Sequence, residues 1–412
     1  MPRSIYIKVF TSWRMAVALL MGFMCGLPLA LTASGSAFQA WMKGNNVDLK
    51  VIGIFSLVGL PYSLKFIWAP LLDRYTPKFL GRRRGWILIS QIGLILSLAI
   101  VTHLNPTSQV TMVGLVAMLI AFFGASQDIV VDAYRAESFP TEQLGAATSV
   151  YVMGYRIAML VSGAVAMMLA DHFSWQTVYF IMCCFLILGL VVTYFSPDPQ
   201  YKMPPPKNLQ EAVVLPFLDF FKRKGAAEIL VFAVIYKLDA VMTMSLTTPF
   251  LLELGFTKTD IGAVSKVFGM IASITGTLAG GALMIRLGVK RSLWLFGIVQ
   301  GFATLSYWIL SRVGYSYPFM VNAIVVENFC SGLANACFLA FLMGVCNKRF
   351  TATQYALLSS LTTVTRAVVG APTGYIVEGL GWSGFYIVCM LTALPGLLLL
   401  LRYDHWDVTA KS

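Results

Sequence analysis

Charged side chains are scarce in this sequence. Asp, Glu, Lys and Arg account for 12% of its 412 residues and hydrophobic residues for 58%, whereas charged residues make up about 25% of an average soluble domain. A water-soluble globule of this length could not remove so much apolar surface from water, but a lipid bilayer can accommodate it. The composition therefore excludes a soluble protein and indicates a chain that crosses a membrane many times.

Residues that support metal or covalent chemistry are also few. The three histidines, His103, His172 and His405, are scattered in or near loops. The seven cysteines lie in or beside apolar segments without metal-ligand spacing, so we interpret them as free thiols. We therefore expect no enzymatic activity, no metal and no bound cofactor.

Long apolar runs recur along the whole chain. A spanning helix needs about 20 apolar residues, and the runs predict an all-α membrane protein with twelve spanning helices in a lipid bilayer. The predicted spans are 14–36, 51–72, 86–104, 109–133, 143–169, 176–195, 228–252, 260–285, 292–311, 318–344, 354–377 and 381–402. We expect the protein to be a monomer.

The basic residues predict the orientation of the chain. Of its 30 Lys and Arg residues, 21 fall in segments on the same side as the N-terminus, and four fall on the other side: Lys43, Lys50, Lys258 and Arg312. Basic residues concentrate in cytoplasmic loops, so both termini are predicted to be cytoplasmic. This dispersal over short loops also explains the net charge of +12 without a nucleic-acid partner.

A proline-rich polar stretch divides the chain almost in half. Residues 196–227 combine several prolines with an amphipathic segment, which is typical of an extended linker followed by a helix on the membrane surface. We predict an N-terminal six-helix bundle over 1–195, a cytoplasmic linker over 196–227 and a C-terminal six-helix bundle over 228–412.

Short motifs recur at corresponding places in the two predicted bundles. The second and eighth predicted helices open with the same Ile-Gly-x-x-Ser-x-Val pattern, at Ile52 and Ile261. A Phe-x-x-x-Gln pattern ends at Gln143 and again at Gln354, and a lone arginine follows 13 and 12 residues later. Duplicated six-helix units around a central cavity are the architecture of major facilitator transporters, and we predict this fold.

Two arginines, Arg156 and Arg366, lie near the middle of predicted helices, where an ionisable residue costs about 3 kcal/mol to insert. A guanidinium fork suits a carboxylate, a phosphate or a sugar hydroxyl. Their symmetric positions favour substrate binding across the cavity. The alternative is a structural ion pair with Asp128 or Glu327.

Two aspartates, Asp128 and Asp132, are four residues apart and so share one face of the fourth predicted helix. Asp128 is the deeper of the two and follows Gln127, which we place at the substrate site. Burial in a cavity of low dielectric favours the protonated form of a carboxyl group, as a proton carrier requires. We expect proton coupling at Asp128, with a fixed ion pair as the alternative, and a gating or solvated role for Asp132.

Three lysines within predicted spans are further candidates for substrate binding: Lys65, Lys237 and Lys266. Snorkelling toward the membrane surface is the alternative for Lys65 and Lys266. Lys237 and Asp239 are two residues apart on a helix and cannot share a face. We expect Lys237 to face the cavity and Asp239 to pair between helices.

Other polar residues complete the predicted site. Glu327 is either a second titrating group or the partner of a cavity cation, and the adjacent Asn328 is a substrate candidate. Tyr62, Tyr155 and Gln39 are candidates for contacts to sugar rings.

The loop after the second predicted helix carries a different signal. Asp73 is followed by Arg74, and an acidic group at a helix end can hold another helix terminus by charge and dipole. We predict that these two residues act as a gate between the halves. We interpret the later run Arg82–Arg84 as a topology signal alone.

In aggregate, the motifs resemble the AmpG muropeptide permeases over residues 13 to 402. The matching runs are Gly26-Leu-Pro-Leu29, Phe55-Ser-Leu-Val-Gly59, Asp73-Arg-Tyr-Thr-Pro77, Gly81-Arg-Arg-Arg-Gly-Trp86, Ala125-Ser-Gln-Asp-Ile-Val130, Gly154-Tyr-Arg156, Tyr236-Lys-Leu238, Ser245-Leu-Thr-Thr248, Cys346-Asn-Lys348 and Ala352-Thr-Gln354.

The resemblance implies a proton-driven importer of the bacterial inner membrane. The family's substrates are anhydromuropeptides, and their uptake serves peptidoglycan recycling and β-lactamase induction. The family's membrane-embedded aspartate corresponds by motif to Asp128. The residues alone leave a second possibility open, a carrier of another bulky anion such as an acyl-CoA or nucleotide-linked metabolite.

Overall fold

The structure is a computed structural model that describes residues 11–32, 36–45, 47, 55–199, 204 and 206–406. All regular structure in these residues is helical. The first half of the chain contains α2 (Trp13–Ala30), α3 (Ser36–Gly44), η1 (Phe55–Gly59), α5 (Leu60–Leu64), η2 (Lys65–Ile67), α6 (Ala69–Arg74), α7 (Gly81–Val101), α8 (Val110–Ser138), η3 (Thr141–Gln143), α9 (Leu144–Leu160), η4 (Val161–Val165), α10 (Ala166–Ala170) and α11 (Trp175–Phe195).

A short helix, α12 (Leu209–Phe221), leads into the second half. That half contains α13 (Ala226–Ile235), α14 (Leu238–Ser245), α15 (Thr247–Glu253), α16 (Lys258–Ala263), η5 (Val264–Gly269), α17 (Met270–Ala303), α18 (Leu305–Val313), α19 (Tyr317–Val345), α20 (Thr351–Leu391), α21 (Ala393–Leu399) and η6 (Leu400–His405).

The long helices α17 and α20 each consist of two rods. Gly288 and Gly381 have positive φ values of 73° and 66° inside them, a conformation that glycine adopts without steric cost. In the part of the chain that the structure describes, eight stretches are long and apolar enough to cross a membrane. One of these, Asp260–Val313, spans 54 residues and contains the break at Gly288. The count of twelve helices agrees with these breaks and stays a prediction.

The first two predicted helices differ from the structure. The first ends at Ala30 rather than residue 36, and α3 follows as a separate helix whose apolar side chains Phe38 and Trp41 are buried. The second is divided into η1, α5, η2 and α6. Both α5 and α6 begin with a proline in the first turn, where its missing N–H is tolerated, so Pro61 and Pro70 restart the helix each time.

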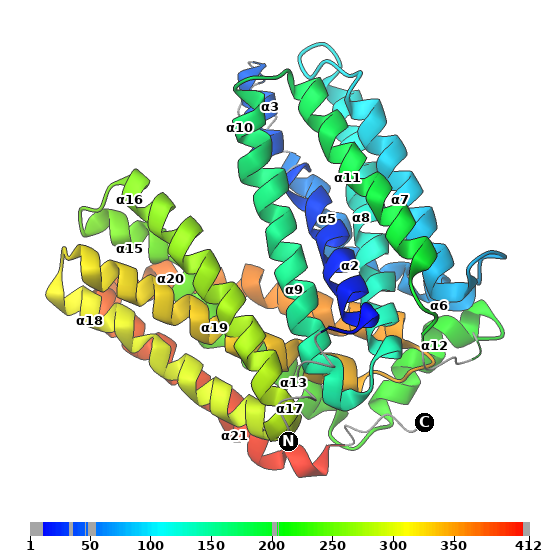
Figure 1. The fold of residues 1–412 in the computed structure, drawn as a ribbon. Helices are drawn as coiled ribbons and strands as arrows, with labels where there is room; N and C mark the ends of the chain where they lie inside the picture. Colours follow the sequence, from blue (N-terminus) through cyan, green and yellow to red (C-terminus); the bar gives the residue numbers. More distant parts are fainter. Residues whose placement is uncertain are drawn as a thin grey trace.

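The two halves converge at one end of the molecule and diverge at the other. Figure 1 shows them meeting near α6, α12 and α21, which we call the closed end, and separating toward α3, α10 and α16, the open end. At the interface, α9 packs on α17 and α19, and α8 packs on α20. The residues that were predicted to be cytoplasmic, such as those after α6 and α19, lie at the closed end.

Close helix packing depends on glycine at two positions. A Cβ atom at Gly154 would lie 2.0 Å from the carbonyl oxygen of Leu19, and one at Gly276 would lie 2.1 Å from that of Phe329. No side chain fits at either position, so α9 approaches α2, and α17 approaches α19, at backbone-to-backbone distance.

Candidate functional site

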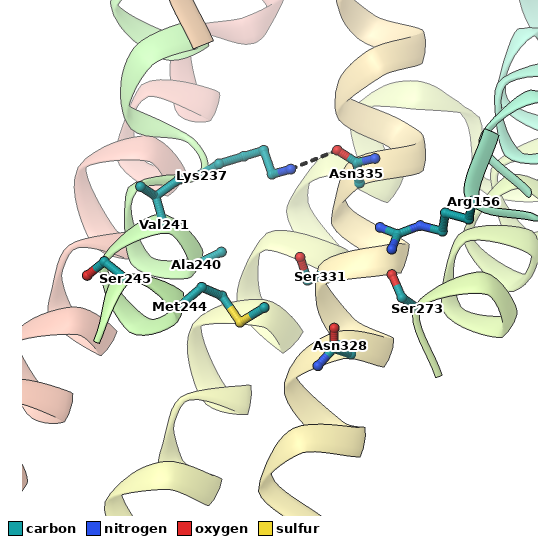
Figure 2. Close-up of a pocket in the computed structure, with 10 residues that line it drawn as sticks. All are labelled: Arg156, Lys237, Ala240, Val241, Met244, Ser245, Ser273, Asn328, Ser331 and Asn335. Carbon is teal, nitrogen blue, oxygen red and sulfur yellow. Dashed lines mark hydrogen bonds between the residues drawn. The ribbon is translucent and has the colours of Figure 1, made fainter. Parts of the chain in front are cut away.

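A polar cavity of about 470 Å³ lies between the two halves. Helix α9 contributes Arg156, and the opposite wall consists of residues from α14 and the residue before it, from α17 and from α19. The lining side chains are Arg156, Lys237, Ala240, Val241, Met244, Ser245, Ser273, Asn328, Ser331 and Asn335 (Figure 2). The volume falls within the range of ligand pockets, about 300–1,000 Å³.

Arg156 supplies the cation on the N-terminal side of the cavity. Its guanidinium group points toward the α19 side chains in Figure 2. Its Nε atom is buried and has no hydrogen-bond partner in the part of the chain that the structure describes, which leaves a donor of the fork available for a ligand oxygen. Arg156 therefore lies where the sequence predicted it, facing the cavity.

Lys237 supplies a second cation from the opposite wall. It is the residue before α14, and its Nζ atom donates a hydrogen bond of 2.7 Å to Oδ1 of Asn335 on α19 (Figure 2). Lys237 thus lines the cavity, as expected from the sequence, and its role in substrate binding stays a prediction. The predicted interhelical partner of Asp239 is absent, since neither carboxylate oxygen of Asp239 has a hydrogen-bond partner among the described residues.

A second cluster surrounds Asp128 inside the N-terminal half. Asp128 is 9% exposed and Lys65 is 8% exposed, and Lys65, Cys25 and Tyr62 are neighbours of its carboxyl group. One carboxylate oxygen of Asp128 and the hydroxyl of Tyr62 are buried, and neither has a hydrogen-bond partner within the described ranges. An unpaired oxygen of this kind is a place where a proton can be added without breaking an existing bond.

The neighbours of Asp128 on α8 have separate partners. The Nε2 atom of Gln127 lies 3.4 Å from the Cys25 sulfur, so Gln127 contacts α2 rather than the cavity. Asp132 pairs with Arg135 of its own helix at 2.7 Å, and the Arg135 guanidinium lies 3.8 Å from the ring centre of Tyr151.

At the closed end, Asp73 joins the two halves. Its Oδ2 atom accepts hydrogen bonds from the backbone N–H and the hydroxyl of Thr353, at 2.9 and 2.8 Å. Thr353 lies in the first turn of α20, so the carboxylate sits at a helix N-terminus where the dipole favours negative charge. The predicted contact of Asp73 with a helix terminus is confirmed.

The arginine that supports this contact is Arg83. Its Nη2 atom lies 2.8 Å from Oδ1 of Asp73 and 2.5 Å from Oε1 of Glu137, and its side chain is 1% exposed. The interpretation of Arg82–Arg84 as a topology signal alone was therefore wrong for Arg83, because the first turn of α7 buries Arg83 between two acids. Arg74, which was predicted to share the gate, packs its guanidinium over the ring of Tyr75.

Comparisons with known proteins agree with this geometry. A family model described as Major Facilitator Superfamily matches residues 13–370. The anhydromuropeptide permease of Escherichia coli (strain K12) is 47% identical over 398 residues, which are 96% of this chain and 81% of that protein. The chain belongs to the Major Facilitator Superfamily. It is a multi-pass membrane transporter, and its all-helical fold with a central cavity confirms the predicted architecture.

Further relatives and two solved structures agree with this assignment. An uncharacterized protein of Haemophilus influenzae is 36% identical, covering 97% of this chain and 96% of that one. A protein of Rickettsia conorii described as putative transporter AmpG 4 is 32% identical, covering 96% and 97%. Within the Major Facilitator Superfamily, the chain is thus a member of the AmpG permease family.

The solved structures show the fold. The proton:xylose symporter XylE, bound to 6-bromo-6-deoxy-D-glucose, superposes with a TM-score of 0.67 at 12% identity, covering 100% of this chain and 98% of that one. The human organic anion transporter MFSD10 superposes with a TM-score of 0.65 at 15% identity, covering 97% and 100%.

Helix α12 is hydrogen-bonded at the closed end to the segment that joins α19 and α20 and to the first turn of α20. Asp219 accepts hydrogen bonds from Asn347 at 3.1 Å, from Gln354 at 2.9 Å and from Arg223 at 2.8 Å. Burial by itself would raise the pKa of Asp219, but the hydrogen bonds from Arg223, Gln354 and Asn347 outweigh it and hold the pKa below its ordinary value. The opposite face of α12 exposes apolar side chains, including Val213 and Phe221, as a helix at a membrane surface does.

We predict that acid weakens the docking of α12. Because the folded-state pKa of Asp219 is lowered, its stabilising contribution is present above the ordinary aspartate value of about 3.9 and is lost as the pH falls through the folded value. The thermal unfolding midpoint of the purified protein should therefore fall more between about pH 5 and about pH 3 in the wild type than in Asp219→Asn. Equal falls in both proteins would contradict this role.

The remaining predicted site residues lie in different places. Asn328 lines the cavity, whereas Gln39 is exposed on α3 at the open end. Tyr155 is a neighbour of both Asp128 and Arg156. The side chains of Lys266 and Arg366 lie outside the described part of the structure, so the symmetric arginine pair stays a prediction.

The sequence predicted Asn328 as a cavity residue but missed Ser245, Ser273, Ser331 and Asn335. Asn328, Ser331 and Asn335 are spaced three and four residues apart on α19 and form one polar stripe. That periodicity was visible as a polar line on an otherwise apolar helix. Ser273 gave no comparable signal, because a lone serine in an apolar helix is common.

Proposed function

We propose that this protein imports anhydromuropeptides across the bacterial inner membrane, driven by a proton gradient and by alternating access. The observation that carries the proposal is the composition of the cavity between the halves. It combines the cations of Arg156 and Lys237 with the amides of Asn328 and Asn335. Anhydromuropeptides are sugar–peptide compounds whose carboxylates and hydroxyls match these donors.

The kinship with the anhydromuropeptide permease of Escherichia coli, at 47% identity, supports the same substrate. A protein of similar fold is a proton:xylose symporter, which supports a proton as the driving ion. Asp128, buried beside Lys65 in the N-terminal half, is our candidate for the coupling group. With the closed end toward the cytoplasm, as the basic residues predict, the structure is open to the periplasm and poised to accept substrate.

Uptake by membrane vesicles tests the proposal. Right-side-out vesicles that contain the protein should accumulate labelled GlcNAc-anhydroMurNAc-peptide when an inward proton gradient is imposed, and a protonophore should abolish the accumulation. Excess acyl-CoA or nucleotide-linked sugar should not compete. If those anions compete and the muropeptide is not accumulated, the protein carries another bulky anion.

Replacing Arg156 by Lys should weaken substrate binding. Lysine keeps the charge but loses the planar fork that binds a carboxylate with two parallel hydrogen bonds. Loss of one charge-assisted bond, about 1.5 kcal/mol, corresponds to roughly a tenfold rise in Kd. Isothermal titration of the detergent-solubilised protein with muropeptide measures it. Arg312→Lys, at an exposed residue of the open end, is the matched control, and an unchanged Kd in Arg156→Lys would remove Arg156 from the site.

A further inference from the structure

Two buried carboxyl groups lie behind the cavity wall in the C-terminal half. Asp239 on α14 is 1% exposed and Glu327 on α19 is 0% exposed. Each is adjacent in sequence to a residue that lines the cavity, Ala240 and Asn328 respectively. The pair is therefore close to the cavity but is enclosed by the helical bundle.

Contacts between three helices place these groups together. On α14, Asp239 is one turn before Thr243, and Gln300 on α17 is one turn before Thr304. The Thr243 and Thr304 hydroxyls lie 3.4 Å apart, so the two helices face each other at this level. Asp239 and Gln300 each lie one turn away from this contact between α14 and α17.

Gln300 connects this level to the third helix. Its Nε2 atom donates a hydrogen bond of 2.7 Å to Oε1 of Glu327. Asp239 and Glu327 are close enough to interact electrostatically. Two carboxyl groups and one amide thus share a single buried site formed by α14, α17 and α19.

Several buried oxygen atoms of this site lack hydrogen-bond donors in the described part of the chain. Among the residues that the structure describes, no hydrogen-bond partner is found for the buried oxygens of Asp239, for Oε2 of Glu327 or for Oε1 of Gln300. All of these orphaned atoms are acceptors, so the site lacks donors. A protonated carboxyl group has the missing O–H donor, and it also avoids the large penalty for two unpaired buried anions.

The other titratable groups near the pair are mostly uncharged at neutral pH. Tyr307, Tyr386 and Cys330 are neighbours of Glu327, Tyr236 is a neighbour of Asp239, and Cys389 is a neighbour of both. Among the described residues, Lys237 is the cation that lies near Asp239. Its ammonium group is hydrogen-bonded to Asn335 at the cavity.

We propose that Asp239 and Glu327 form a second proton-binding site, in the C-terminal half, in addition to Asp128 in the N-terminal half. The ligand is a proton taken from and returned to the cavity water, and Gln300 holds the pair in register. This inference rests on the proposed proton-driven transport and extends it. Each half then contains one buried acid site beside the cavity.

The proton-to-substrate ratio tests the second site. In proteoliposomes, the membrane potential that stops net flux of labelled muropeptide at a fixed gradient gives the charge moved per substrate. Glu327→Gln and Asp239→Asn should each lower this ratio by about one proton, because the proposed site holds one proton that both carboxyl groups share. Thr304→Val, which removes a neighbouring hydroxyl but no titratable group, should keep the wild-type ratio.

Two outcomes of this experiment overturn the proposal. One is an unchanged ratio in both carboxyl variants. The other is a ratio that depends on sodium rather than on pH when choline replaces sodium, which would assign the oxygens to an alkali cation. A wild-type protein that moves no protons with muropeptide would instead refute the proposed function.

Infrared spectroscopy tests the pair without any substrate. A difference spectrum of the purified protein after a pH jump should contain the C=O stretch of a protonated carboxyl group. Glu327→Gln should remove one component of this band, and the conservative Glu327→Asp should keep a shifted one. An unchanged band in Glu327→Gln would overturn the second site whatever the substrate, and Asp239→Asn provides the same test if Glu327→Gln does not fold.

Discussion

Replacing Asp128 by Asn should abolish accumulation of substrate against a gradient. Asparagine cannot gain or lose a proton, so the variant cannot couple transport to the proton gradient. The cavity residues Arg156 and Lys237 are untouched, and substrate binding should therefore be retained. Exchange of labelled for unlabelled muropeptide across vesicle membranes, which needs no net proton movement, should continue.

A matched control separates coupling from general damage. Asp171 is exposed beyond α10 at the open end, and Asp171→Asn should accumulate substrate as the wild type does. If Asp128→Asn loses binding as well as accumulation, Asp128 is a structural partner of Lys65 rather than a proton carrier.

Replacing Arg83 by Leu should severely destabilise the closed end. The substitution leaves Asp73 and Glu137, which are 0% and 2% exposed, as buried carboxylates without their shared cation. Breaking a buried pair in this way costs about 3–5 kcal/mol. The thermal unfolding midpoint should fall, and the equilibrium should shift away from the conformation in which the halves meet at this end.

The thiol of Cys346 reports on that shift. It is fully buried at the closed end, just before α20. In a background where the other cysteines are replaced, its reaction with a soluble maleimide should accelerate in Arg83→Leu. Arg84→Leu is the control, because Arg84 contacts the half-exposed Asp198 and backbone carbonyls of α11, so its loss leaves no buried carboxylate without a cation. Equal labelling in both variants would contradict the buried network.

The sequence was sufficient to predict the fold because membrane insertion imposes a simple rule. Apolar length and basic loops determine where a helix crosses and which way it runs. The same rule does not locate interruptions that arise from tertiary packing. The second predicted helix is continuous in hydropathy, yet Pro61 and Pro70 divide it into short pieces, and α3 forms because Phe38 and Trp41 are buried against neighbouring helices.

The site could be predicted in part, since an ionisable residue inside a membrane is conspicuous. Arg156 and Lys237 were found for this reason, and both line the cavity. Asn328 was also predicted, because it follows Glu327, whereas the uncharged Ser273 gave no signal of its own. Arg83 was misjudged for the opposite reason, because a loop arginine has an obvious topological role and nothing in its local sequence reveals the buried acids Asp73 and Glu137.

The contact between Asp73 and Thr353 makes the closed end a fixed point about which α20 can rotate. Thr353 is at the first turn of α20, and the rod runs on for roughly 30 residues to the break at Gly381, or about 45 Å. A rotation of about 10° around this anchored turn would carry the far end of the rod through roughly 8 Å. Two hydrogen bonds to one carboxylate can therefore control a helix movement that, at the open end, is about as large as a sugar ring.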